Sequence, residues 1–423
     1  MRKTILEFDS ICGRELPEGH FEELLEFVEH SGSADLLKVM VPGYRRGIGR
    51  TLTARNHVGS IHLSDGTVIE ILPKIGDSIG ADASRSILLT MLREVHDLPM
   101  VELGDRFSGS DEMVPFEFFI RMFIKETYRI VDDGLCRSYN DIEANESALR
   151  GRIDFTENIK RNLVHRERFC QEYQLLNEDR AENRLIRSTL DLLYGISIDQ
   201  NNRRDLNDLT SWFGCVEPSI NIQRDLEMVR IDRGMENYAH VLDWCRLFLE
   251  NTSFTFADGC NRTRSFLFQM DILYERFVAS LVRKLGRRMF RVSTQDSGTR
   301  LFEEWDSVRL RPDIVLRDGK RTIVIDTKWK RIMSHRDISV SDLYQMYAYS
   351  IRFRTERTIL LYPNIGGRCH PFTDSVNGVR IEVRFIDMLD ARGSMERLLQ
   401  DMSSLTESMG VHEVHGRVIP ERW

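Results

Sequence analysis

One segment, RPDIVLRDGKRTIVIDTKWKR at residues 311–331, constrains the fold of this chain more than any other part of the sequence. Two runs rich in β-branched residues flank Asp318-Gly319, and an Asp-Gly pair between such runs predicts a β-hairpin with a two-residue turn. A turn formed by these two residues would place Asp313 opposite Val324. The segment therefore predicts two antiparallel strands with a fixed register.

Three polar side chains of this hairpin are expected on one face. Because side chains alternate between the two faces of a strand, Asp313, Asp326 and Lys328 point to the same side. In the predicted register Asp326 is the diagonal neighbour of Asp313 on the adjacent strand, within roughly 7–8 Å between the two backbone positions. Two carboxylates at this spacing can share one hard divalent cation. We therefore expect both aspartates to be metal ligands, together with the backbone carbonyl of Thr327.

These residues suit the hydrolysis of a phosphodiester bond, which needs an activated water and positive charge near the scissile phosphate. We expect Mg²⁺ as the cofactor, with Mn²⁺ as a possible substitute. Lys328 would orient the water or help to deprotonate it, and would balance charge in the transition state. The pattern of PD, a turn and then DTK matches the signature of the PD-(D/E)xK nucleases. The alternative is a solvated ion pair of Asp326 with Lys328 or Arg311 on an edge strand.

A third acidic candidate is Glu275, in the predicted helix FLFQMDILYERFVASLVRKLG. Its stripe at helical spacing is otherwise apolar and contains Phe268, Ile272, Ala279 and Val282. A carboxylate on such a stripe is costly unless a metal or a basic group pairs with it. Glu275 is therefore a candidate metal ligand and catalytic acid, and the alternative is that it marks the boundary of the buried face.

The segment SDLYQMYAYS places Gln345 and Tyr349 four residues apart on one face of a predicted helix. This spacing resembles the QxxxY element that follows the lysine strand in the RecB-like branch of these nucleases, and it implies a supporting role at the catalytic site. Asp342 with Gln345 three residues later also fits a capping box. That alternative would leave Tyr349 without a role.

The composition of the chain limits its partners. The 423 residues carry a net charge of −7, which argues against binding DNA by bulk electrostatic attraction alone. The sequence has no GxxxxGK[ST] phosphate loop, so we expect that this chain itself binds no nucleotide. No apolar run reaches membrane-spanning length and no signal-peptide core follows the basic start, so we expect a cytoplasmic protein with no membrane partner.

Two other patterns give only weak signals for a metal site or a disulfide. The seven cysteines are scattered without a CxxC pair, which favours buried free thiols. The HEVH segment at residues 412–415 has no third ligand nearby, which argues against a metal site there.

The pattern of periodic segments divides the chain into four parts. We expect a strand-rich N-terminal domain at 1–110, a mostly helical middle domain at 111–254, a PD-(D/E)xK nuclease domain at 255–400 and a polar tail at 401–423. The third part should begin with the helix that contains Glu275, and Gly286 would close that helix. The predicted fold class is a multidomain protein of mixed α+β and α/β type, with a small mixed sheet in a restriction-endonuclease-like C-terminal domain.

Several segments together resemble the McrC family, the nuclease subunits of McrBC modification-dependent (type IV) restriction systems. The segments are IEILPKIG, LRGRIDF, EDRAENRLI, LYERFV and the RPDIVL…VIDTKWK core. The resemblance implies a DNA endonuclease subunit of an antiviral defence system. This subunit has no nucleotide site of its own, works with an AAA+ GTPase ring of the McrB type, and stimulates its GTPase.

The resemblance also assigns residues by position. It places the catalytic aspartate, aspartate and lysine of the family on Asp313, Asp326 and Lys328. It implies that the N-terminal part, at 1–110, engages the AAA+ ring. The candidate contacts there are the basic side chains Arg45, Arg46 and Arg50.

Two other functions are compatible with the same pattern. The first is a non-catalytic adaptor or activator of an AAA+ motor that keeps the nuclease fold as a scaffold, and the intact set of two aspartates and a lysine argues against it. The second is a stand-alone RecB-like repair nuclease that acts on DNA ends. The helical middle domain and the segments shared with the McrC family argue against this second alternative.

Overall fold

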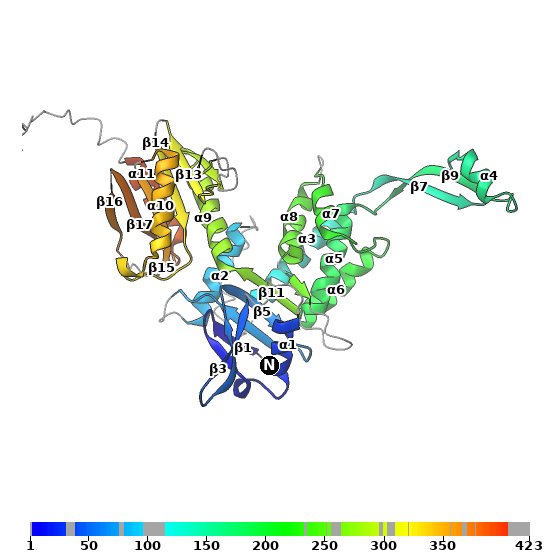
Figure 1. Cartoon of the computed structure of the whole chain (residues 1–423). Coiled ribbons are helices and arrows are strands. Elements are labelled where there is room, and N and C mark those ends of the chain that lie inside the picture. Colours follow the sequence, from blue (N-terminus) through cyan, green and yellow to red (C-terminus); the bar gives the residue numbers. More distant parts are fainter. Residues whose placement is uncertain are drawn as a thin grey trace, which may run out of the picture. The chain divides into compact units, whose positions relative to one another are not determined.

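The computed structural model describes residues 2–30, 39–75, 80–95, 115–231, 235–250, 252–254, 264–295, 299–302, 309–319, 321–355, 357–365, 370–376 and 378–404. The described residues form a mixed α/β protein with several sheets and are coloured along the chain in Figure 1, which confirms the expected mixed multidomain class. Within them, no helix has both the length and the apolar character that crossing a membrane requires.

The chain folds into two compact units. The described residues of unit 1 come from Ser60–Val68 and Leu98–Phe266, and those of unit 2 come from Arg2–Gly59, Ile69–Asp97 and Leu267–Trp423. Unit 2 is therefore assembled from three separate stretches of the sequence, and most of unit 1 lies between the second and the third.

Two sheets contain the strands of the N-terminal part of the chain, and the later strands β10 and β11 join the first of them. One sheet of five strands has the order β1-β6-β5-β11-β10, and a second sheet of three strands has the order β2-β4-β3. The strands are β1 (Arg2–Leu6), β2 (Ser10–Cys12), β3 (Met40–Arg45), β4 (Gly49–Ala54), β5 (His57–His62), β6 (Val68–Leu72), β10 (Thr252–Phe254) and β11 (Arg264–Gln269). The helices of this part are α1 (His20–His30) and α2 (Ala81–Val95).

Unit 1 contains five helices in the described residues beyond Pro115, besides the short helix described below. They are α3 (Pro115–Asp133), α5 (Ala181–Ile196), α6 (Gln200–Trp212), α7 (Ile222–Met228) and α8 (Glu236–Glu250). Their core is aromatic: Trp244 stacks on Phe248 with ring centroids 5.9 Å apart, and Phe119 and Phe123 pack against this pair. The prediction of helices in this region is correct for these segments.

A three-stranded arm extends from these helices, and the sequence analysis did not predict it. The arm comprises residues 138–177 and has the strand order β7-β9-β8 (Figure 1). Its elements are β7 (Ser138–Glu146), β8 (Arg152–Ile153), α4 (Phe155–Arg161) and β9 (Phe169–Asn177). The middle part of the chain is therefore not only helical.

Hydrogen bonds fix the base of the arm to the helices. The Asn183 amide on α5 donates to the backbone oxygens of Cys136 at 3.0 Å and Glu178 at 2.8 Å, which flank the two long strands. The Tyr238 hydroxyl on α8 donates to the Asn183 side-chain oxygen at 2.8 Å and accepts from the Cys136 backbone N–H at 3.0 Å. The EDRAENRLI segment therefore anchors the arm where both strands leave the helices.

A six-stranded mixed sheet forms the C-terminal part of unit 2, in the order β12-β13-β14-β15-β17-β16. Its strands are β12 (Arg291–Thr294), β13 (Ile314–Asp318), β14 (Arg321–Thr327), β15 (Arg357–Asn364), β16 (Phe372–Val376) and β17 (Val379–Asp387). The pairs β14–β15 and β15–β17 are parallel and the other pairs are antiparallel. The helices are α9 (Met270–Gly286), α10 (Val340–Phe353) and α11 (Ala391–Ser404).

Helix α10 connects the parallel strands β14 and β15 and lies over the sheet (Figure 1). Met346 and Tyr349 of α10 pack against Val315, Val324 and Leu360 of the sheet in one buried cluster. The polar side chains on this face of β13 and β14 thus lie next to α10, at the end of a rigid apolar core.

The start of α9 differs from the sequence prediction. Phe268 belongs to β11, which lies between β5 and β10 in the five-stranded sheet, so the sheet context overrides a weak local helical pattern. Ile272 on α9 is 40% exposed whereas Ala279 and Val282 are buried, so the half-buried Glu275 lies at the boundary of the buried face, as the alternative stated. Gly286 is the last residue of α9. Its φ is not positive, so it does not form the left-handed cap that the sequence predicted, and a β-carbon at this position would contact the Leu399 side chain.

Some sequence predictions fall outside the described residues. The HEVH segment lies in 405–423, which the structure does not describe, and α11 occupies the chain up to Ser404. Cys260 and Cys369 are also outside. The cysteines that are described are free thiols, namely Cys12, Cys136, Cys170, Cys215 and Cys245.

The arm requires a glycine at position 151. A β-carbon at this position would clash with the backbone oxygen of Glu172 and would lie 2.5 Å from Cβ of Tyr173. We expect Gly151→Ala to destabilise the arm by about 1–3 kcal/mol and to leave the helices of unit 1 folded. Hydrogen exchange should become faster within 138–177 only, and Gly47→Ala, at a position with open space but positive φ, should leave the arm unchanged.

Candidate functional site

The hairpin of β13 and β14 has a different register from the predicted one. Asp318 pairs with Arg321 and Val315 pairs with Val324, so Asp318 is the last residue of β13 and not a turn residue. The prediction that Asp318 and Gly319 form the turn is wrong, because Gly319, with φ +55°, takes the first turn position and Asp318 completes the strand.

The observed register brings the two aspartates closer together. Continued one residue past the last pair, Ile314 with Ile325, it places Asp313 directly opposite Asp326. Side chains that face each other across an antiparallel pair have β-carbons about 4.5–5.5 Å apart, less than the predicted diagonal spacing. The two aspartates therefore lie on one face of the hairpin, as predicted, and the observed register brings their β-carbons closer together than the predicted register would.

Asp313 is held by Thr327. Its Oδ2 atom accepts hydrogen bonds from the Thr327 backbone N–H at 2.6 Å and from the Thr327 hydroxyl at 2.7 Å. Burial raises the pKa of Asp313, and these two hydrogen bonds oppose that rise. Thr327 thus orients Asp313, and its role as a carbonyl ligand stays a prediction.

The buried Asp326 forms an ion pair with the half-buried Lys328. The Lys328 ammonium lies 2.7 Å from Asp326 Oδ2, without the geometry of a directed hydrogen bond. Burial raises the pKa of Asp326 to about 7, and the charge of Asp313 adds to the rise. Burial acts to lower the pKa of Lys328, but the charge and close contact of Asp326 together with the charges of Asp342 and Asp313 outweigh it, and the pKa of Lys328 is raised.

The alternative of a solvated pair on an edge strand is therefore wrong. Strand β14 lies between β13 and β15, and Asp326 is only 1% exposed. A buried ionised pair at this position is costly unless other groups stabilise it.

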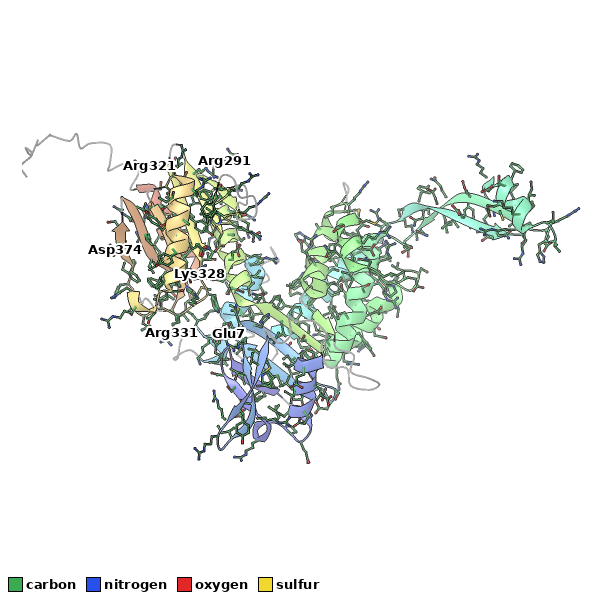
Figure 2. All side chains as sticks on the ribbon, viewed as in Figure 1. Glu7, Arg291, Arg321, Lys328, Arg331 and Asp374 are labelled. Atoms are coloured by element: carbon green, nitrogen blue, oxygen red, sulfur yellow. The ribbon has the colours of Figure 1, made fainter. Side chains whose placement is uncertain are left out.

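A chain of hydrogen bonds connects Lys328 to α10. The ammonium donates to Gln345 Oε1 at 3.2 Å, the Gln345 amide donates to the Tyr349 hydroxyl at 2.7 Å, and this hydroxyl donates to the Arg311 backbone oxygen at 3.1 Å. Figure 2 labels Lys328 beside the sheet of unit 2. The structure thus joins the two residues of the QxxxY element to the lysine.

The capping-box alternative for Gln345 does not agree with the structure. The N-cap of α10 is Ser339, which makes no side-chain cap, and the Asp342 carboxylate accepts from the Lys330 ammonium at 3.1 Å. Gln345 is left to contact Lys328 and Tyr349.

Glu275 approaches the same site from α9. The Gln295 amide donates to Glu275 Oε1 at 2.8 Å, and the Arg311 guanidinium donates to Gln295 Oε1 at 2.5 Å. Burial and then the charge of Asp313 raise the pKa of Glu275, so the two acids lie within electrostatic reach of each other. Glu275 is therefore near the aspartates, but an amide holds its carboxylate.

Gln295 is a site residue that the sequence analysis missed. Its backbone φ of +50° is unusual for a residue other than glycine, and its backbone N–H donates to the Asp313 carbonyl at 2.9 Å. No sequence pattern indicates Gln295, because it follows β12 without a motif and its backbone conformation cannot be read from local periodicity.

The two carboxylates present could hold a divalent cation such as Mg²⁺. Among the residues that the structure describes, no group of three His, Cys, Asp or Glu side chains is placed to hold a metal. Mg²⁺ commonly binds to one or two carboxylates and keeps several water ligands. The facing carboxylates of Asp313 and Asp326, both with raised pKa values, meet that requirement, and a cation would offset their mutual repulsion.

The ammonium of Lys328 should control the protonation of Asp326. We expect Lys328→Met to raise the pKa of Asp326 further above about 7, since removal of the positive charge destabilises the buried carboxylate. Carbon-13 NMR titration of labelled aspartate side chains in the metal-free protein measures this shift. Lys330→Met is the matched control, because the Lys330 ammonium pairs with Asp342. Equal shifts in both variants would contradict the assignment.

Comparisons with known proteins agree with one another. The sequence matches the family model described as "McrBC 5-methylcytosine restriction system component" over residues 52–363. It is 24% identical over 263 residues to the "Type IV methyl-directed restriction enzyme EcoKMcrBC" of Escherichia coli (strain K12), which covers 55% of this chain and 72% of that relative.

Two solved structures from Thermococcus gammatolerans are also similar. The first is a half-complex from a tetradecameric assembly of McrB AAA+ hexamers with bound McrC, with a TM-score of 0.66 and 20% identity over 95% of this chain and 100% of that chain. The second is a McrBC complex with a TM-score of 0.48 and 21% identity over 67% of this chain and 88% of that chain. The first of these shows a common fold.

Proposed function

Because the chain belongs to the family of McrBC 5-methylcytosine restriction system components, we propose that it is a Mg²⁺-dependent DNA endonuclease subunit that works with an AAA+ GTPase ring of the McrB type. The observation that carries this proposal is the arrangement of Asp313, Asp326 and Lys328 on neighbouring strands, with Lys328 fixed by Gln345. In this proposal the sheet of β12–β17 with α9, α10 and α11 is a PD-(D/E)xK nuclease domain. Stimulation of the partner's GTPase is part of the same proposal.

Each residue of the site has a defined task in this mechanism. Asp313, oriented by Thr327, and Asp326 would hold the cation, which when bound supplies Lewis-acid polarisation of the phosphate and an activated water. Lys328 has a raised pKa, so it stays an ammonium and balances negative charge in the transition state instead of acting as a base. Gln345 and Tyr349 keep the ammonium beside Asp326.

Substitution of the three central residues tests this function. We expect Asp313→Asn, Asp326→Asn and Lys328→Met each to reduce DNA cleavage by at least about a hundredfold, because each removes a charge that acts at the phosphate. The measurement is cleavage of methylated DNA by the chain with its AAA+ partner in Mg²⁺ or Mn²⁺, with chelator as the metal-free reference.

The control is Asp374→Asn. Asp374 is exposed on β16, the edge strand of the same sheet, and is labelled in Figure 2. This variant should cleave like the unaltered chain. Full cleavage by all three site variants would refute the endonuclease proposal.

The same assay separates the two alternative functions. GTPase stimulation without cleavage in Mg²⁺ or Mn²⁺ would identify an adaptor or activator. Strong cleavage at DNA ends without the partner would identify a stand-alone RecB-like nuclease.

We propose that the arm contacts the AAA+ partner. Large apolar side chains at its outer part are strongly exposed: Phe155 by 71%, Ile159 by 67%, Leu163 by 70% and Val164 by 83%. A concentration of exposed apolar side chains on a protein that stays folded in water usually marks a protein-binding surface. The base of the arm is fixed by Asn183, so these side chains are presented on a rigid support.

The basic side chains of the β3–β4 region are further candidates for contact with the AAA+ partner. Arg45 and Arg46 are exposed at the turn between β3 and β4, where Tyr44 is 76% exposed. Arg50 forms an ion pair with Glu22 of α1, so part of its charge is already compensated.

Removal of exposed apolar side chains from the outer part of the arm should weaken assembly with the AAA+ partner and leave the candidate catalytic site intact. We expect the double variant Leu163→Ser and Val164→Ser to reduce co-elution with the AAA+ partner in size-exclusion chromatography at least tenfold, with an unchanged melting temperature. Ile220→Ser is the matched control, because Ile220 is fully exposed on unit 1 outside the arm. Unchanged assembly of the double variant would exclude the arm as the main contact.

A further inference from the structure

A buried glutamate near the N-terminus contacts the loop that carries Lys328. Glu7 follows β1 and is 0% exposed. Its Oε2 atom accepts hydrogen bonds from the Trp329 indole N–H and from the Lys74 backbone N–H, both at 3.1 Å. Trp329 comes directly after Lys328, so the residue that follows the first strand of the chain lies against the loop of the candidate lysine; Figure 2 labels both Glu7 and Lys328.

The burial of Glu7 is energetically unfavourable by itself. Burial raises its pKa to about 7, the two hydrogen bonds oppose the rise, and the charge of Asp271 on α9 adds to it. Its Oε1 atom is buried without a hydrogen-bond partner among the described residues. A carboxyl group in such a position costs stability, and an apolar residue of the same size would avoid that cost.

The loop after Lys328 depends on the side chain of Trp329. The Lys328 backbone N–H donates to the Leu361 carbonyl at 3.0 Å, and the Lys330 N–H donates to the Lys328 carbonyl at 3.0 Å. Trp329 is thus the central residue of a three-residue turn. Its indole ring lies 5.3 Å from the buried Tyr274 ring of α9, next to Glu275. The ring is therefore held between Glu7 and α9, and its orientation determines how the turn presents Lys328.

The backbone around Glu7 is held in a strained conformation. Phe8 has a φ of +66°, in the left-handed region that an aromatic residue rarely adopts. The Phe8 N–H donates to the Ala54 carbonyl at 3.1 Å and the Glu7 N–H donates to the Leu72 carbonyl at 2.9 Å. Such strain persists where surrounding bonds over-determine the conformation. The N-terminal strands therefore fix the position of the Glu7 carboxyl group.

We propose that Glu7 is a positioning residue of the nuclease site, which acts through Trp329 to keep the Lys328 ammonium beside Asp326. This inference rests on the proposed function, since the position of Lys328 matters for cleavage only if the chain is a nuclease. It makes the N-terminal strand part of the catalytic machinery without any contact between Glu7 and DNA or metal.

Variants of both partners test the proposal in the full chain with its AAA+ partner. We expect Glu7→Ala and Trp329→Phe to lower kcat for DNA cleavage about tenfold with little change in KM, because a misplaced ammonium affects the transition state more than binding. Glu7→Gln keeps an oxygen that accepts from the indole, so it should retain most of kcat.

A second measurement does not depend on activity. Hydrogen exchange at the Lys328 and Lys330 amides should become faster in Glu7→Ala and in Trp329→Phe, and should stay near that of the unaltered chain in Glu7→Gln. The matched control is Glu70→Ala, which removes another buried N-terminal carboxylate, one that pairs with Arg2 and Arg85 and not with this loop. It should lower stability and leave kcat and these amides unchanged.

Specific outcomes would overturn the inference. Unchanged kcat and unchanged amide exchange in Glu7→Ala would show that Glu7 does not position Lys328, and so would equal losses in Glu7→Ala and Glu70→Ala at equal stability. Failure of the proposed function is recognised separately, because the unaltered chain would then cleave no DNA in Mg²⁺ or Mn²⁺ while the exchange measurement still decides the role of Glu7.

Discussion

The C-terminal sheet is organised around two carboxylates of like charge that face each other across one pair of strands. Asp313 and Asp326 both have raised pKa values, and each acid disfavours ionisation of the other. The structure reduces this cost with the Thr327 hydrogen bonds and the Lys328 ammonium. A residual repulsion remains, and a bound divalent cation would remove it. The repulsion between the two carboxylates is thus a cost in stability that a bound positive ion would reduce.

The polar groups around the two carboxylates come from three different elements of unit 2. Gln345 and Tyr349 come from α10, Glu275 from α9 and Gln295 from the end of β12. These side chains are held by rigid elements or by specific backbone hydrogen bonds. Such support allows a catalytic group to stay within a fraction of an ångström of its working position.

The sequence alone predicted the parts of this arrangement that depend on local patterns. Period-two alternation placed Asp313, Asp326 and Lys328 on one face, and helical spacing placed Gln345 with Tyr349. The turn was misplaced by one residue, because Asp-Gly chemistry is compatible with more than one turn position. Phe268 was assigned to a helix although it belongs to β11, which lies between β5 and β10 in the sheet, because sheet neighbours are not visible in a local pattern. Gln295 and Glu7 could not be predicted, since each reaches the loop or site through contacts far away in the sequence.

The discontinuous composition of unit 2 has a consequence for the synthesis of the protein. Glu7 and Trp329 are separated by 322 positions, and unit 1 is translated almost entirely between them. The first strands leave the ribosome long before the hairpin that they will contact exists, and such long-range closure makes folding slow. A nascent or truncated chain that ends before β14 contains neither Asp326 nor Lys328. The candidate site can therefore form only after the chain has been synthesised beyond Lys328.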